Sequence, residues 1–206
     1  MDVVSSPRSS FIVILNTEEV PSQVDWGIAA KNLIEKWDRP VLDMLGVNLS
    51  NAIDTVFLTL RNVEEGIAWT DGNNIDVTSF WMNLHPEDLG LIVHDLVHVH
   101  QDYPHFEPGW ITEGIADYIR WGFYENKPLD WFPVDTTLDG YTRSYRITGG
   151  FYIWLKNIES KGIVKILDKA MKSSEYSDSI FAEQTGLSLT QLWKEYLMSR
   201  KSDEKI

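Results

Sequence analysis

The stretch HDLVHVHQDYPHFEPGWITEGIAD, residues 94–117, holds four of the five histidines of this 206-residue chain. His94 and His98 stand four residues apart, a spacing that places two side chains one above the other on the same face of a helix. The neighbouring positions are mostly apolar, which predicts a buried helix over 86–101 whose two imidazoles reach the same point in space. By itself, such a pair is equally typical of histidines with a structural role.

The second half of the stretch supplies carboxylates on another predicted helix, over 109–122. Glu113 stands fifteen residues after His98, and Asp117 follows one turn later. Two imidazoles and one carboxylate form a catalytic zinc set that leaves a fourth position for water. A solvated acidic face is the alternative explanation, but most of this helix is apolar. We therefore predict one zinc ion per chain, held by His94, His98 and Glu113, with Asp117 accepting the outer N–H of a ligand histidine.

The other polar residues of the stretch have less direct roles. Gln101 falls on the face of the two ligand histidines, one turn further along the helix. His100 points away from that face and is a poor third ligand. His85, just before Pro86, is expected at a helix entry. His105 lies between the two predicted helices, where it is either a surface residue or a substrate contact.

Composition excludes several classes of partner. The chain has 31 acidic and 18 basic residues and a net charge of −13, which repels nucleic acid and anionic lipid. It has no cysteine, so any metal must be held by His, Asp or Glu. No apolar run reaches the length of a transmembrane helix. We expect neither a nucleic-acid partner nor a membrane span.

The order of predicted elements indicates an α+β fold. Strands are expected at 11–16, 54–62, 66–70 and 74–81, and a helix over 21–47 that is kinked or split at Pro40. The Asp71-Gly72 turn predicts a hairpin, and the sheet is expected to be small and mostly antiparallel. Further helices are expected at 142–160, 162–173, 177–184 and 189–201. We predict a flexible lead-in over 1–9 and a single domain over 10–206, sheet-rich over 10–85 and helical over 86–206.

Several segments are similar to the plant basic secretory proteins and their bacterial relatives, gluzincin-type zinc metallopeptidases. They are HDLVHVHQ, EGIADYIR, DGYTRSYRITGGFYIWL, YSDSIF and LTQLWKEYL, within residues 75–198. The resemblance implies a zincin-like fold, the same three metal ligands, and a secreted or cell-envelope location. It also implies Tyr141 as a hydrogen-bond donor to the oxyanion of the reaction, and Arg146 as a further site residue. The alternatives are a packing role for Tyr141 and a structural ion pair for Arg146.

One departure from the family pattern bears on the mechanism. The family has glutamate where this chain has Asp95, so the motif reads HDxxH in place of HExxH. Our first hypothesis is a zinc-dependent peptidase that acts on peptides or proteins, with Asp95 as a general base of reduced reach. The alternative is a catalytically inactive binding protein with the same fold. Its groove would hold a peptide or a glycan against aromatic residues, the candidates being Trp81, Trp110 and Trp131.

Overall fold

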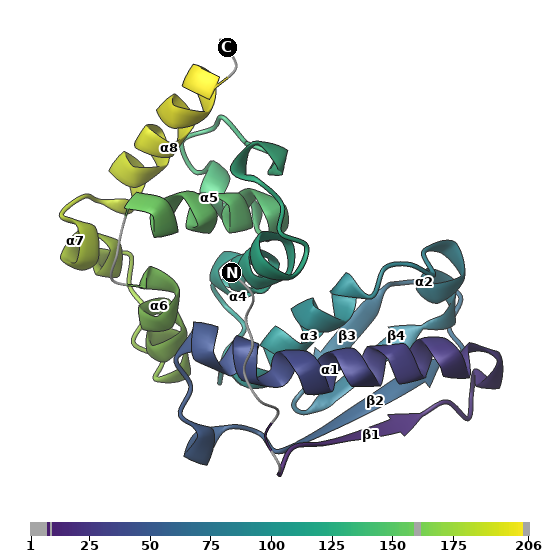
Figure 1. The fold of residues 1–206 in the computed structure, drawn as a ribbon. Coiled ribbons are helices and arrows are strands. Elements are labelled where there is room, and N and C mark those ends of the chain that lie inside the picture. The colour runs from purple at the N-terminus through teal and green to yellow at the C-terminus, as the bar shows by residue number, and fades with distance from the viewer. Residues whose placement is uncertain (1–7, 9, 159–161, 204–206) are drawn as a thin grey trace. The chain divides into compact units, whose positions relative to one another are not determined.

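The computed structural model describes residues 8, 10–158 and 162–203, and within these ranges it contains eight α-helices and four β-strands (Figure 1). The chain divides into two units, Met1–Asp102 and Tyr103–Ile206. The predicted lead-in over 1–9 lies outside the described residues except for Arg8. The guanidinium of Arg8 binds the buried carboxylate of Asp38.

The first unit carries a four-stranded mixed sheet in the order β1-β2-β4-β3. β1 (Ile12–Asn16) pairs parallel with β2 (Thr55–Arg61), and β2 pairs parallel with β4 (Asn74–Thr78). Only β3 (Ala68–Asp71) runs antiparallel to its neighbour, in the β3–β4 hairpin. The predicted α+β class is confirmed, but the expectation of a mostly antiparallel sheet is wrong. A helix connects β1 to β2, and such a crossover returns the chain in the parallel direction.

Two helices cover one face of this sheet, α1 (Val24–Leu45) and α3 (Gly90–Gln101). They pack on each other and on the strands, whose inward residues are buried: Val13, Val56, Leu58, Leu60, Ile75 and Val77. Gly27 lets α1 approach the sheet closely, because a Cβ there would lie 3.1 Å from Leu15 and 3.2 Å from Leu60. α3 packs beside α1 on the same layer.

α1 continues through Pro40, so the predicted kink or split does not end the helix. Proline removes one backbone hydrogen bond and crowds the preceding turn. Trp37, Val41 and Leu42, on both sides of Pro40, are buried against the rest of the unit and hold the two halves in one element.

The boundary after β4 also differs from the prediction. The expected strand over 74–81 stops at Thr78, and α2 (Ser79–Leu84) follows directly. The Thr78 hydroxyl accepts a hydrogen bond from the backbone N–H of Trp81, which caps this short helix.

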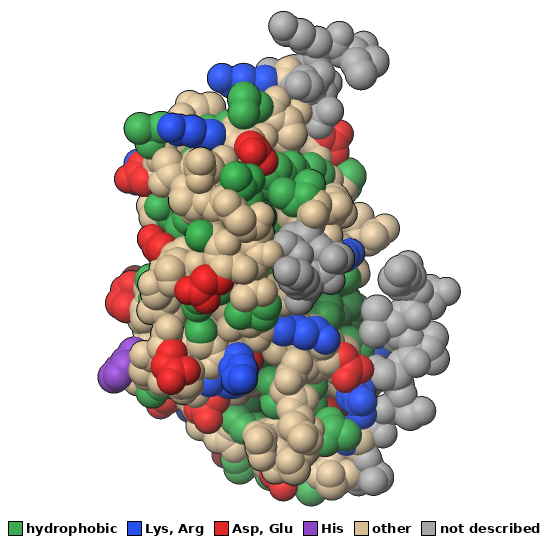
Figure 2. Space-filling model, turned by 90° about the vertical axis from the view of Figure 1, so that its left-hand side faces the viewer, with side chains coloured by type: hydrophobic (Ala, Val, Ile, Leu, Met, Phe, Trp, Pro, Cys, Tyr) green, Lys and Arg blue, Asp and Glu red, His purple; other side chains and the backbone are tan. Residues whose placement is uncertain are grey.

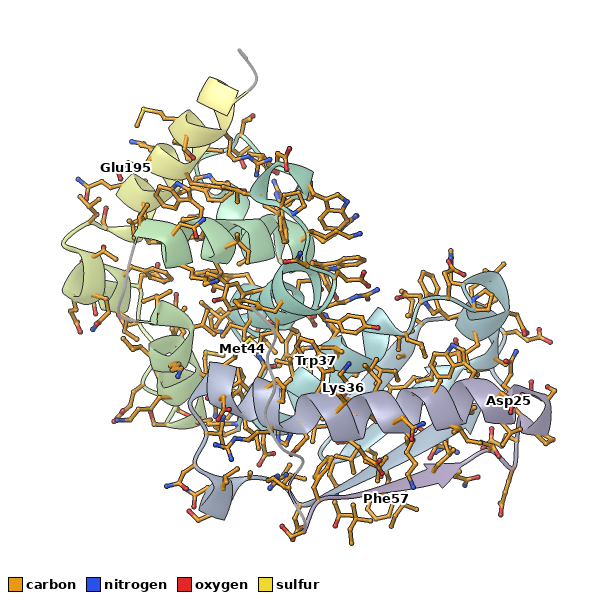
Figure 3. All side chains as sticks on the ribbon, in the orientation of Figure 1. Asp25, Lys36, Trp37, Met44, Phe57 and Glu195 are labelled. Atoms are coloured by element: carbon orange, nitrogen blue, oxygen red, sulfur yellow. The ribbon has the colours of Figure 1, made fainter. Side chains whose placement is uncertain are left out.

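On the sheet itself, Phe57 of β2 is exposed, with 37% of its surface accessible (Figure 3).

The second unit is helical. α4 (Gly109–Ile119) continues into a π-helical turn at Arg120–Tyr124, and α5 (Tyr145–Ile158), α6 (Ile163–Lys172), α7 (Ser179–Thr185) and α8 (Leu189–Asp203) follow. Short 3₁₀ helices lie at Leu129–Trp131 and Gly140–Arg143. The core is strongly aromatic; its fully buried members include Phe132, Phe151, Tyr152, Phe181, Trp193 and Tyr196. These helices match the predicted ones, although residues 159 and 160 of the expected 142–160 helix are outside the described ranges.

α4 and α5 form the closest helix pair of this unit, and glycines allow the approach. A Cβ at Gly114 would overlap the Thr148 side chain and come within 3.1 Å of the Tyr152 ring. A Cβ at Gly149 would lie 3.1 Å from the backbone nitrogen of Tyr118. The residue after Glu113 is therefore small because α5 occupies the space beside it.

Charged side chains of both signs are mixed with apolar ones on the face drawn in Figure 2. Among the described helices, none is long and apolar enough to cross a membrane.

Candidate metal centre

His94 and His98 lie on successive turns of α3, and their Nε2 atoms are 3.0 Å apart. Their rings meet edge to face, with centroids 4.7 Å apart and an interplanar angle of 85°. Two nitrogens that bind one tetrahedral zinc ion at its usual bond length are separated by about 3.3 Å. The pair is therefore already spaced for a shared cation.

Gln101 determines which nitrogen of His98 is available to a metal. Its side-chain oxygen lies 2.7 Å from His98 Nδ1, and the Gln101 side chain is buried. An amide oxygen can only accept, so Nδ1 carries the proton and the lone pair resides on Nε2. A metal-binding histidine is typically oriented by such a bond to its other nitrogen. Gln101, which was predicted to lie on the ligand face, therefore leaves Nε2 of His98 as the nitrogen that can bind a metal.

Glu113 is the third member of the group. It lies on α4, half-buried, directly before the glycine that packs against α5. His94, His98 and Glu113 each offer one ligand atom, and these atoms all lie within 4.8 Å of one another. Two imidazole nitrogens and a carboxylate suit zinc, so the residues fit the predicted ion and can hold a metal. Within the described ranges, they are the one such group of three.

Asp95 follows the first ligand histidine and is buried, with 6% of its surface exposed. The hydroxyl of Thr70 lies 2.9 Å from its Oδ1 and 3.3 Å from its backbone oxygen. Thr70 lies on β3, the strand that packs against α3. This contact orients the Asp95 carboxylate. It could not be predicted from the sequence, where Thr70 is one of several threonines in strands.

Asp117 is buried one turn after Glu113 on α4, beside the close approach of Gly149. Gln101 already occupies the outer nitrogen of His98. The proposed partnership of Asp117 with a ligand histidine therefore concerns His94, and it stays a prediction.

Tyr141 lies in the 3₁₀ helix before α5 and packs against the first turn of α4. Its ring centroid is 5.1 Å from that of Trp110, three residues before Glu113, and 5.9 Å from that of Trp193. Burial raises the pKa of its phenol, and the nearby carboxylates of Asp178 and Asp139 raise it further. At neutral pH the hydroxyl is therefore protonated and able to donate a hydrogen bond.

The other residues singled out in the sequence are not members of this group of three. His100 is buried and its Nε2 is 2.9 Å from Asp38 Oδ1, which agrees with its exclusion as a ligand. His85 ends α2 with its ring 4.1 Å from that of Trp81. His105 is exposed in the connection between α3 and α4. Arg146 is exposed, with its guanidinium carbon 5.6 Å from the centroid of the Trp131 ring.

A half-buried set of two imidazoles and one carboxylate on helices of an α+β chain defines a candidate metalloprotein. Comparison of the sequence with known families makes the class more specific. Residues 24–196 match the BSP family, described as peptidases of plants and bacteria, and the chain belongs to this family. The match includes both helices that carry the metal-binding group and confirms the resemblance found in the sequence. No curated protein and no solved structure matches the chain.

Proposed function

We propose that this protein is a zinc-dependent peptidase whose metal is held by His94, His98 and Glu113. The observation that carries the proposal is the orientation of the two imidazoles. Two Nε2 atoms 3.0 Å apart, one of them kept unprotonated by Gln101, need a shared proton or a cation between them. Membership in a peptidase family supplies the reaction class, and peptides or proteins are the proposed substrates.

The chain's own residues have distinct roles in this mechanism. A bound zinc ion would polarise the scissile carbonyl and acidify water. Asp95 accepts the proton of the attacking water and passes it to the leaving amine. The protonated hydroxyl of Tyr141 donates a hydrogen bond to the oxyanion that develops on the substrate.

Asp95 sets the expected rate. Its carboxylate is carried on a stem one methylene shorter than that of glutamate, a difference of about 1.5 Å. A displacement of about 1 Å can cost roughly a hundredfold in rate. Thr70 holds this carboxylate in one orientation, which limits the rotamers through which Asp95 could recover the lost reach. We therefore expect slow hydrolysis.

The test combines metal content with hydrolysis of a peptide library. The purified protein should contain about one zinc per chain, and His98→Ala should lose it, whereas His105→Ala in the exposed connection should keep it. Equal metal content in all three proteins would overturn the metal site.

The same library then separates an enzyme from an inactive relative. Hydrolysis should be abolished by a chelator and by Asp95→Asn. A zinc-loaded protein that stays inactive, and gains activity as Asp95→Glu, would instead identify the chain as an inactive binding protein for peptides or glycans.

A further inference from the structure

Two tryptophans from separate segments stack in the second unit, and cations lie against both rings. The guanidinium carbon of Arg120 lies 4.1 Å from the centroid of Trp121. The ring centroids of Trp121 and Trp131 are 4.8 Å apart with an interplanar angle of 34°. The ammonium nitrogen of Lys127 lies 5.4 Å from the centroid of Trp131, and the guanidinium carbon of Arg146 lies 5.6 Å from it. The backbone N–H of Lys127 donates to the carbonyl of Trp121, which fastens the loop to the π-helical turn. We call Trp121, Lys127, Trp131 and Arg146 the tryptophan–cation cluster.

Lys127 and Arg146 differ from many other basic residues of the chain in their lack of a carboxylate partner in the part that the structure describes. Although acidic residues outnumber basic ones by 31 to 18, neither Lys127 nor Arg146 forms an ion pair with a carboxylate within the described ranges. The cations that do pair with carboxylates include Arg8, Arg39, Arg61, Arg143 and Lys172. Lys127 and Arg146 are therefore two cations without a carboxylate partner among the described residues of an acidic protein.

The physics of the arrangement favours an anion. An aromatic ring attracts each cation, but the two like charges held by one ring repel each other. An oxyanion that accepts hydrogen bonds from both would relieve this repulsion and form charge-assisted contacts. We infer that the tryptophan–cation cluster binds a carboxylate.

The position of the cluster suggests the source of this carboxylate. The π-helical turn that carries Trp121 continues α4, and its first residue, Arg120, lies seven residues after Glu113. Seven residues of helix rise by about 10 Å, a length that an extended peptide covers with about three residues. The ligand is therefore assigned as a carboxylate of the peptide substrate, a few residues from the bond that is cut. This assignment of the ligand to a substrate rests on the proposed peptidase function.

The test measures binding and does not require turnover. The probes are a blocked alanine–glycine heptapeptide with one central glutamate, its glutamine twin, and the glutamine peptide with a free C-terminus. Tryptophan fluorescence of the full chain reports binding, and mass spectrometry checks that each peptide stays intact. We expect a carboxylate-bearing peptide to bind about tenfold tighter than the blocked glutamine peptide at low salt. The preference should decrease as salt is raised. The glutamate and free-terminus peptides show which carboxylate the cluster takes.

Matched variants locate the effect. The double variant Lys127→Met/Arg146→Met keeps apolar stems on the Trp131 ring and should bind all three peptides equally. Lys156→Met is the control, because Lys156 lies 4.5 Å from the Phe123 ring and outside the cluster; it should keep the preference. Equal binding of the three peptides by the wild type, or a preference that survives the double variant, would overturn the inference. Neither result depends on metal content or hydrolysis, so failure of the cluster and failure of the peptidase proposal remain distinguishable.

Discussion

At the scale of single residues, Gln101 links the sequence motif to metal chemistry. Replacing Gln101 by leucine removes the acceptor at His98 Nδ1, so the tautomer with the proton on Nε2 is no longer disfavoured. We expect metal affinity to fall by about 10- to 100-fold, the usual cost of losing a partner of a ligand histidine. Competition with a chromogenic chelator measures this change.

The conservative variant separates orientation from packing. Gln101→Glu keeps an acceptor at the same place and should bind metal at least as tightly as the wild type, because a carboxylate makes the imidazole more basic. An affinity in Gln101→Leu that equals the wild-type value would contradict this role for the side chain.

At the scale of elements, the contact of α4 with α5 depends on Gly114. A methyl group there would overlap Thr148 and force the two helices apart. We expect Gly114→Ala to lower the free energy of unfolding by about 2 kcal/mol, as is typical of overpacking in a filled core. Urea denaturation measures the change.

A second substitution tests the cause. Thr148→Ser removes the Cγ2 methyl group but keeps the hydroxyl, which donates to the backbone oxygen of Tyr141. In the Gly114→Ala background it should restore part of the lost stability, whereas Thr148→Ser alone should not stabilise the protein. Strictly additive effects of the two substitutions would rule out the overlap as the cause.

At the scale of the whole molecule, the described part of the first unit is tied together by Asp38. Its buried carboxylate accepts from Arg8 at 2.7 and 2.9 Å, and it meets His100 of α3 at 2.9 Å. Burial by itself raises the pKa of Asp38, but the hydrogen bonds from His100 and Arg8 outweigh it and hold the pKa below its ordinary value. A carboxyl group with a lowered pKa in the folded state stabilises the protein above its unfolded pKa. This contribution is lost as the pH falls through the folded pKa.

The expected consequence is a pH-dependent effect of Asp38→Asn. At pH 7 the substitution should cost about 3 kcal/mol, because it leaves Arg8 buried without its counter-charge. The difference from the wild type should begin to shrink below about pH 4, because the carboxyl then takes up a proton in the unfolded chain while its lowered pKa in the folded state still resists protonation. Urea denaturation across this range measures it. Asp43→Asn, which affects only the exposed pair with Arg39, should change stability by less than about 0.5 kcal/mol at any pH. A constant cost of Asp38→Asn from pH 7 to pH 3 would be inconsistent with this linkage.

Local patterns were sufficient to predict much of the fold and of the candidate site. The spacing of His94 and His98, and the place of Gln101 one turn later, follow from helical periodicity alone. The helices of the second unit were also predicted close to their observed bounds, because apolar periodicity and helix-ending glycines are local signals.

Other features depend on contacts between segments far apart in the sequence. The crossover of α1 sets the parallel pairing of β1 with β2. β4 lies parallel to β2 because β3, which comes between them in the sequence, pairs on the other side of β4. Strand patterns encode neither arrangement. The continuity of α1 through Pro40 reflects burial on both sides of the proline. The bond from Thr70 to Asp95 joins a strand to a helix twenty-five residues away.

The sequence by itself therefore determined which residues could hold a metal and the helices on which they lie. The spacing of residues along a helix sets the face to which their side chains point. Only the tertiary structure decided the restraint on Asp95 and the close approach of α5 behind Glu113. Each of these depends on partners of defined geometry that are brought together by packing, and such partners leave no periodic signal in the chain.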